Sequence, residues 1–227
     1  MAENNIRKQK DRFLEDRLAR YDRWRREGKI TTSSKVIPIG ESLSARQRVL
    51  QTDQAIEILR QAESFALTKC LCRSHYGRCR NPVEVCLMID AAADKYVAAG
   101  KARYISIEDA EEALRTADQH GLVHLTLSNP EQKVFALCNC CPCCCHDLLL
   151  LRTYGRNDLI ARSEFIALTD LSKCVHCGDC VMRCVFKARS MDDGIMVTVP
   201  KACYGCGLCV TICPEQAIVM EPRTIPE

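Results

Sequence analysis

Residues 174–184 read CVHCGDCVMRC, and residues 203–213 repeat the pattern as CYGCGLCVTIC. Each run spaces its cysteines as C-x2-C-x2-C-x3-C, and the second run begins 29 positions after the first. Three thiolates two residues apart let a tight loop wrap one iron–sulfur cube, with backbone N–H groups directed at the cluster sulfurs. Zinc also takes four thiolates, but structural zinc sites usually separate two C-x2-C pairs by a longer loop. The spacing therefore predicts two 4Fe-4S clusters, with ligands Cys174, Cys177, Cys180, Cys184, Cys203, Cys206, Cys209 and Cys213.

Residues 163–222 resemble the bacterial two-cluster ferredoxin family. The resemblance rests on the eight cysteines, on Pro214 after the last of them, and on loop glycines at 178, 205 and 207. It departs from the family at Val185, where a proline usually follows the fourth cysteine and shapes the turn. In two-cluster ferredoxins the fourth cysteine of each run ligates the other cluster. The resemblance thus implies one cluster on Cys174, Cys177, Cys180 and Cys213, and another on Cys203, Cys206, Cys209 and Cys184.

Ten further cysteines lie in the runs KCLCRSHYGRCRNPVEVC (69–86) and CNCCPCCC (138–145). Adjacent cysteines in extended chain point to opposite faces, so the second run need not serve one centre. One extra iron–sulfur cluster, two centres or one large centre would fit the count, as would a zinc site or buried apolar thiols. We expect metal binding, with at least one additional iron–sulfur cluster, by some of Cys70, Cys72, Cys79, Cys86, Cys138, Cys140, Cys141, Cys143, Cys144 and Cys145.

This half of the chain resembles the amino-terminal region of a group of iron–sulfur proteins from anaerobes. That group joins a C-x-C-R start and a C-N-C-C-x-C-C-C run to a two-cluster ferredoxin tail, and both runs occur here. No activity is established for the group as a whole, so the resemblance supports a folded unit without supplying a mechanism.

The composition favours a cytoplasmic location. Eighteen cysteines in 227 residues would suggest disulfides in a secreted chain, but the start MAENNIRKQK lacks the apolar run of a signal peptide. No stretch approaches the ~18 apolar residues of a membrane span. The excess of basic over acidic residues is concentrated in residues 1–29, whereas the whole chain has a net charge of only +3. Because no basic stripe runs through the body of the chain, we expect no nucleic-acid partner.

The predicted fold class is α+β. Residues 4–28 predict a basic amphipathic helix, which would pack on its own domain, dock on a partner subunit or lie on a membrane surface. Residues 30–44 predict a linker, since Thr, Ser, Pro and Gly are frequent there. The remaining predicted helices are 53–64, 83–98 and 107–120, and the predicted strands are 133–137, 163–168 and 195–199. These elements predict an arm at 1–29, a linker at 30–44, a mostly helical cysteine-rich metal-binding unit at 45–155 and a dicluster ferredoxin module at 156–227.

Three functions remain open. The first is electron transfer, in which the chain passes low-potential electrons to or from a larger redox enzyme of an anaerobic complex. The second is a reductase subunit, in which an extra cluster in the N-terminal unit is catalytic. No dinucleotide fingerprint, phosphate loop or radical-SAM run is present to support a more specific chemistry. The third is a metal-handling or redox-sensing protein. We favour electron transfer and name no catalytic residue.

Overall fold

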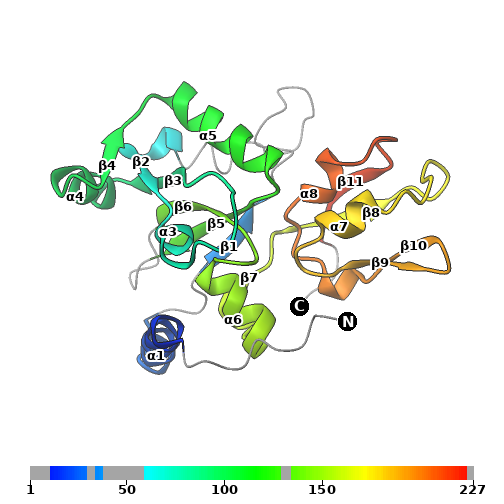
Figure 1. The fold of residues 1–227 in the computed structure, drawn as a ribbon, viewed down its shortest axis with the longest axis horizontal. Helices are drawn as coiled ribbons and strands as arrows, with labels where there is room; N and C mark the ends of the chain where they lie inside the picture. The colour runs from blue at the N-terminus through cyan, green and yellow to red at the C-terminus, as the bar shows by residue number, and fades with distance from the viewer. Residues whose placement is uncertain (1–10, 30–33, 38–58, 129–133, 224–227) are drawn as a thin grey trace.

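A computed structural model describes residues 11–29, 34–37, 59–128 and 134–223 in two parts (Figure 1). The first part is built on a seven-stranded sheet with the order β4-β2-β3-β6-β5-β1-β7. All its strand pairs are antiparallel except β1 with β7. It contains α1 (Arg12–Arg26), β1 (Ser34–Ile37), β2 (Phe65–Lys69), α3 (Leu71–Tyr76), β3 (Glu84–Ile89), α4 (Ala91–Ala98), β4 (Ala102–Tyr104), α5 (Ile107–Gln119), β5 (Val123–Ser128), β6 (Val134–Cys140), α6 (His146–Tyr154) and β7 (Ile160–Ala161).

The second part lies on the right of Figure 1 and carries two small antiparallel sheets, β8 with β11 and β9 with β10. A short helix begins after the second cysteine of each motif and contains the third. Its elements are β8 (Phe165–Thr169), α7 (Asp179–Arg183), β9 (Arg189–Asp192), β10 (Ile195–Thr198), η1 (Pro200–Ala202), α8 (Leu208–Thr211) and β11 (Ile218–Pro222).

The α+β class is confirmed, but the mostly helical N-terminal unit is wrong. The predicted helix 83–98 is the strand β3, followed after Asp90 by the shorter helix α4. Five consecutive residues of β3 are buried, since the strand is covered on both faces. A strand of that kind has a continuous apolar run, which periodicity alone does not separate from a buried helix. Strand β4 also lies between α4 and α5, where the sequence predicted two helices without a strand between them.

Other predicted elements agree better with the structure. Helix α5 begins at Ser106, whose side chain forms a capping box with Asp109, and Gly121 follows its end at φ +68°. Strands β6, β8 and β10 overlap the three predicted strands. The predicted linker is wrong at residues 34–37, which form β1 between β5 and β7. The described residues do not include the other parts of the predicted linker, 30–33 and 38–44. They also do not include residues 53–58 of the predicted helix 53–64.

The basic helix is confirmed over α1, and Asp11 caps it by accepting a hydrogen bond from the Leu14 backbone N–H. Its predicted start lies outside the described residues. Leu14 and Tyr21 are buried against Leu150 and Leu159, which supports the interpretation that the helix packs on its own domain.

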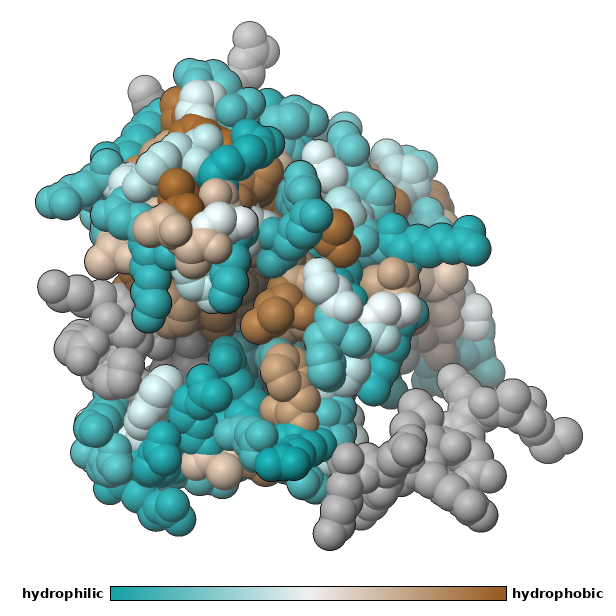
Figure 2. All heavy atoms as spheres, turned by 60° about the vertical axis from the view of Figure 1, so that its left-hand side comes forward, coloured by the Kyte–Doolittle hydropathy of each residue, from teal (hydrophilic) through white to brown (hydrophobic). Residues whose placement is uncertain are grey.

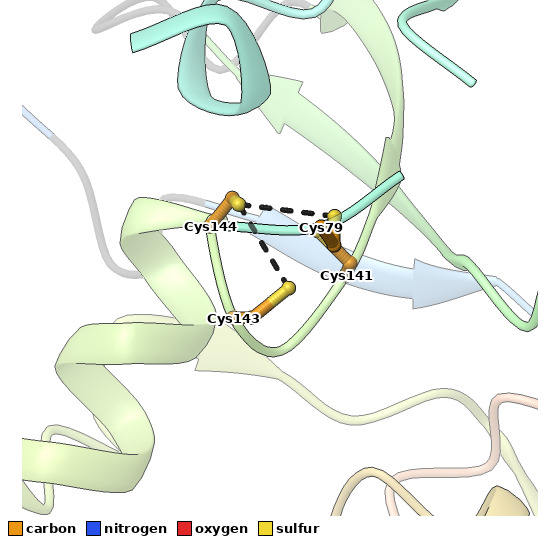
Figure 3. A group of neighbouring side chains, drawn as sticks. All are labelled: Cys79, Cys141, Cys143 and Cys144. Carbon is orange, nitrogen blue, oxygen red and sulfur yellow. Dashed lines mark hydrogen bonds between the residues drawn. The ribbon is translucent and has the colours of Figure 1, made fainter. Parts of the chain in front are cut away.

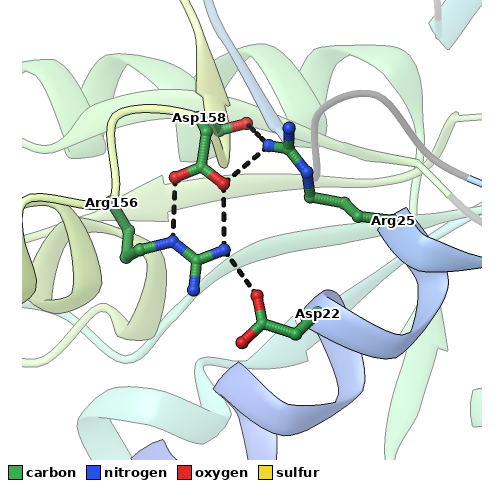
Figure 4. A network of polar contacts seen from close by, with 4 residues as sticks. All are labelled: Asp22, Arg25, Arg156 and Asp158. Atoms are coloured by element: carbon green, nitrogen blue, oxygen red, sulfur yellow. Dashed lines mark hydrogen bonds and ion pairs between the residues drawn. The ribbon is translucent and has the colours of Figure 1, made fainter.

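Ion pairs hold the same helix to the segment after α6 (Figure 4). Arg156 contacts both Asp22 of α1, at 2.6 Å, and Asp158, at 2.8 Å. Arg25 of α1 also reaches Asp158, at 2.6 Å. Hydrophobic burial and a shared network of ion pairs thus fix α1 on α6 and on the segment that follows α6.

The second part docks on the C-terminal end of α5. Arg183 of α7 donates hydrogen bonds to the backbone carbonyls of Asp118 and Gln119, at 2.5 and 3.3 Å. Thr211 of α8 donates to the Asp118 carboxylate at 3.2 Å. A cation is favourable at a helix C-terminus because the last carbonyls lack helical partners. The helices of the two cysteine motifs are therefore anchored to the first part.

None of the helices in the described ranges combines the length and the apolar character needed to cross a bilayer. On the face shown in Figure 2, hydrophilic side chains predominate and hydrophobic ones are scattered among them.

Candidate iron–sulfur and thiolate sites

The eight motif cysteines line two separate hollows. The walls of hollow A include Cys174, Cys177, Cys180 and Cys213. The walls of hollow B include Cys184, Cys203, Cys206 and Cys209. Each hollow thus collects three cysteines of one motif and the last cysteine of the other. These are the same two sets that the resemblance to two-cluster ferredoxins implies.

Backbone N–H groups point at the sulfurs of both hollows. Gly205 donates to Cys203 Sγ at 3.3 Å, Ala188 to Cys184 Sγ at 3.2 Å and Ala217 to Cys213 Sγ at 3.3 Å. Such bonds stabilise negative charge on thiolates and on a cluster that they hold. The loops therefore supply the polar contacts expected around an iron–sulfur cluster.

Gly205 is required by the packing of hollow B. Its φ is +71°, and a Cβ placed there would come within 2.1 Å of the Phe165 carbonyl oxygen. A side chain at this position would force the Cys203 loop away from β8. This glycine explains how the loop can follow the sheet closely.

Buried thiols in hollow B hold their protons tightly. Burial raises the pKa of Cys206 and raises that of Cys209 to about 11. Because a metal or cluster binds thiolates, its binding in hollow B would release these protons.

Arg189 of β9 lies between the two hollows and is 5% exposed. Its Nη1 is 3.9 Å from Cys180 Sγ in hollow A. Burial would lower its pKa, but Cys209 of hollow B and Cys180 raise it, so the guanidinium stays charged. It also donates to Thr169 Oγ1 at 2.8 Å. One buried cation thus serves both thiol sets.

His176 lies beside hollow A without an obvious ligand role. Its Nδ1 accepts a hydrogen bond from the Met196 backbone N–H at 3.0 Å, and it lies 3.8 Å from Cys174 Sγ. The ring therefore connects the first cysteine loop to β10.

The ten remaining cysteines separate into two groups. Six of them influence one another's pKa values as close neighbours, from Cys72 to Cys70 and then to Cys86, Cys138, Cys140 and Cys145. We call these residues the six-thiol group. Cys138 and Cys140 are two residues apart on β6 and share a face, and Cys86 lies on the neighbouring strand β3. Cys70 and Cys72 come from the start of α3, and Cys145 immediately precedes α6.

Helix α1 lies close to the six-thiol group. Phe13 of α1 contacts the rings of His75 and His146, with centroids 4.1 and 4.4 Å apart. His146 Nδ1 is in turn 3.3 Å from Cys72 Sγ. Burial, and then the charge of Arg17, lowers the pKa of His146 to about 4. A neutral imidazole and a helix therefore shield this end of the group.

The other four thiols, Cys79, Cys141, Cys143 and Cys144, form the four-thiol group (Figure 3). All four sulfurs lie within 4.8 Å of one another. Cys79 comes from the segment after α3, and the other three come from the turn between β6 and α6. Cys141 and Cys144 are buried, whereas Cys79 and Cys143 are partly accessible.

Arg73 connects the two N-terminal groups. It is 3% exposed, and it donates to the Asn139 carbonyl at 3.0 Å and to Cys141 Sγ at 3.5 Å. The negative charge of Cys70 contributes to its raised pKa. The sequence motif C-x-C-R contains this residue, but neither Arg73 nor Arg189 was expected to contact a thiol.

Hollow B borders the six-thiol group. Cys206 of hollow B belongs to the same buried apolar cluster as Cys140 and Cys145, together with Tyr204 and Leu208. Phe186 packs against this cluster and stacks on Tyr204, with ring centroids 4.4 Å apart. The two parts of the chain thus meet through a buried apolar core that has thiols on both sides.

Comparisons with known proteins agree on the second part. Residues 166–215 match the family model of a 4Fe-4S dicluster domain. Over 53 residues the chain is 43% identical to the pyruvate synthase subunit PorD of Thermotoga maritima, which covers 23% of this chain and 54% of that protein. Over 54 residues it is 34% identical to the uncharacterized ferredoxin MJ0199 of Methanocaldococcus jannaschii, which covers 23% of this chain and 87% of that protein. The match thus spans about half the length of the first of these relatives.

The C-terminal part is therefore an iron–sulfur module of the ferredoxin type. It gives the chain a metal-binding, electron-transport character.

Proposed function

We propose that the chain is an electron-transfer subunit with one 4Fe-4S cluster in hollow A and one in hollow B. The ligands would be Cys174, Cys177, Cys180 and Cys213 in hollow A, and Cys203, Cys206, Cys209 and Cys184 in hollow B. The observation that carries this proposal is the sorting of the eight thiols into two sets of four, each served by backbone N–H donors. Such clusters supply one-electron transfer.

The six-thiol group is the proposed third redox centre, an additional iron–sulfur cluster. It is supported by the apolar cluster that Cys206 shares with Cys140 and Cys145. Dry packing between two thiol sets excludes water and keeps the separation short and fixed. The protein would thereby relay electrons between the ferredoxin module and the N-terminal sheet.

The proposed partner is a larger redox enzyme of an anaerobic complex. The relative PorD is named as a subunit of pyruvate synthase, which supports a subunit role here. Around hollow A, Val175 is 60% exposed and Met182 is 84% exposed. Exposed apolar side chains beside an iron–sulfur ligand loop suit a contact surface for a redox partner. We place the docking edge there, since the apolar side of α1 is already packed on α6.

Pairwise cysteine variants test the ligand sets. Cys177→Ser and Cys213→Ser belong to one set, so each should remove about four irons and the double variant should remove no more. Cys177→Ser combined with Cys184→Ser crosses the sets and should remove about eight irons. The two double variants share Cys177→Ser and differ only in the second cysteine that is replaced. Additive losses for Cys177 with Cys213 would contradict the crossed ligation.

A second candidate function is a reductase whose substrate reacts at the six-thiol group. It is favoured by the surplus of thiols over the four of a simple cluster and by the adjacent His146. His146→Gln should then abolish reduction of a disulfide or small-molecule acceptor while dithionite still reduces the ferredoxin module. If wild type and variant reduce the acceptor equally well, the reductase function is contradicted and electron transfer is the one proposed function that is left.

A further inference from the structure

The sulfurs of the four-thiol group are too close together for a cluster and well placed for a single ion. Cys79 Sγ is 3.8 Å from Cys141 Sγ and 4.0 Å from Cys144 Sγ, and Cys143 Sγ is 3.8 Å from Cys144 Sγ. The largest separation within the group stays within 4.8 Å. The four sulfur atoms therefore form one compact group, and the side chains of Cys79, Cys141, Cys143 and Cys144 are drawn together in Figure 3.

A tetrahedral metal–thiolate centre requires this size. With a metal–sulfur bond of about 2.3 Å, the sulfurs of a regular tetrahedron lie about 3.8 Å apart. In a 4Fe-4S cluster each thiolate binds a different iron at a corner of the cube, so the four sulfurs are spread wider. Among the described residues, the four-thiol group is the one set of possible ligands that comes this close together, whereas each set of ferredoxin-type cysteines surrounds a hollow.

The chain forms this arrangement locally. The turn after β6 is closed by hydrogen bonds from the Cys144 and Cys145 backbone N–H groups to the Cys141 carbonyl, at 3.4 and 3.1 Å. That turn brings three of the four thiols together, and the segment carrying Cys79 closes the group from the other side.

The surroundings compensate the charge of such a centre. A divalent ion with four thiolates carries two net negative charges. Arg73 provides a buried positive charge at 3.5 Å from Cys141 Sγ. Arg78 reaches the Cys143 carbonyl at 3.3 Å. Two arginines therefore stand beside a site that would otherwise be an uncompensated buried anion.

We propose that Cys79, Cys141, Cys143 and Cys144 bind one tetrahedral, thiol-seeking divalent ion, zinc or ferrous iron, as a site separate from every iron–sulfur cluster of the chain. Binding exchanges thiol protons for metal–sulfur bonds and requires no change of oxidation state. Its role is structural. It ties the segment after α3 to the turn that carries Cys140 on one side and Cys145 on the other, and so fixes the spacing of the six-thiol group.

The first test is metal analysis with X-ray absorption on the full chain purified without oxygen. We expect one zinc, or one iron without a matching acid-labile sulfide, per chain. If the ion is zinc, absorption at the zinc edge should show four sulfurs at about 2.3 Å and no neighbouring metal. If it is iron, total iron should exceed acid-labile sulfide by one per chain. A chain without such an ion, or a metal–metal neighbour for every bound atom, would overturn the proposal. This measurement needs no variant and so does not depend on mutant folding.

The second test uses the two accessible ligands. The double variant Cys79→Ser with Cys143→Ser should lose the single ion and keep its acid-labile sulfide content. Cys177→Ser in hollow A is the matched control, which should lose sulfide and iron together and keep the single ion. Loss of iron and sulfide in equal amounts from the double variant would show that the four-thiol group holds a cluster. Because the proposed electron transfer is read from sulfide-matched iron, its failure would leave the single-ion result unchanged.

Discussion

Replacing Arg189 by methionine should make the clusters of hollows A and B harder to reduce. The guanidinium is buried, lies 3.9 Å from Cys180 Sγ and also interacts with Cys209. Its positive charge favours the reduced, more negative form of either cluster. Removing that charge while keeping an apolar stem of similar length should therefore lower both reduction potentials.

The expected size follows from the distance. Two unit charges about 4 Å apart interact by about 4 kcal/mol at an effective dielectric constant of about 20. Since an added electron spreads over a whole cluster, about half of this energy applies. At about 59 mV per 1.36 kcal/mol for a one-electron couple, a loss of about 2 kcal/mol corresponds to roughly 90 mV. We therefore expect the potential to fall by roughly 50–100 mV.

The assay is an anaerobic redox titration followed by EPR on wild type, Arg189→Met and Arg189→Lys. The lysine variant retains the charge and should recover more than half of the shift. Unchanged potentials in the methionine variant with full iron content would refute the electrostatic role of Arg189. An equal shift in both variants would assign the effect to lost packing.

Further predictions concern the loops and α1. Gly205→Ala should reduce the iron content of hollow B, because its Cβ would collide with the Phe165 carbonyl oxygen; quantification of iron and sulfide checks this. Leu14→Ala should cost about 2–3 kcal/mol of α1 docking and expose that helix to protease, whereas full protection would contradict its packing on α6. Asp158→Asn removes the shared partner of Arg25 and Arg156 and should weaken docking by up to about 1 kcal/mol, measured as faster amide exchange in α1. High salt should reduce the difference in α1 amide exchange between wild type and Asp158→Asn, because it screens the ion pairs.

The spacing of the eight cysteines was almost sufficient by itself to predict the C-terminal iron–sulfur module. Eight thiols at short, repeated intervals leave few alternatives to two cluster-binding loops. The two strands predicted beside the motif overlap β8 and β10. The crossed sets came from the resemblance, and the same sets line hollows A and B.

The N-terminal sheet was missed for a physical reason. Strand β3 is buried over five consecutive residues, so its sequence lacks the alternation that marks a half-exposed strand. The linker prediction at 34–37 failed because the pairing of β1 with β5 joins residues about 90 positions apart, and no local signal records such a contact.

The division of the ten N-terminal cysteines could not be read from spacing either. Neighbours in the run 138–145 serve different groups, because Cys138 and Cys140 share a face of β6 while the turn directs Cys141, Cys143 and Cys144 elsewhere. Cys79 and Cys86 are only seven residues apart, yet Cys79 belongs to the four-thiol group and Cys86 to the six-thiol group. The fold, through strand pairing and one turn, sorts the thiols.

The most direct test of the account is an EPR-monitored reductive titration of the full chain, prepared without oxygen. Arg189 contacts a cysteine of each hollow, Cys180 and Cys209, so the two hollows are neighbours and two clusters reduced by one electron each should give magnetically coupled signals. The account predicts such signals, and it predicts that they disappear when an added redox partner reoxidises the clusters. A chain that accepts no electrons at low potential, or that carries zinc in place of iron in both hollows, would contradict it.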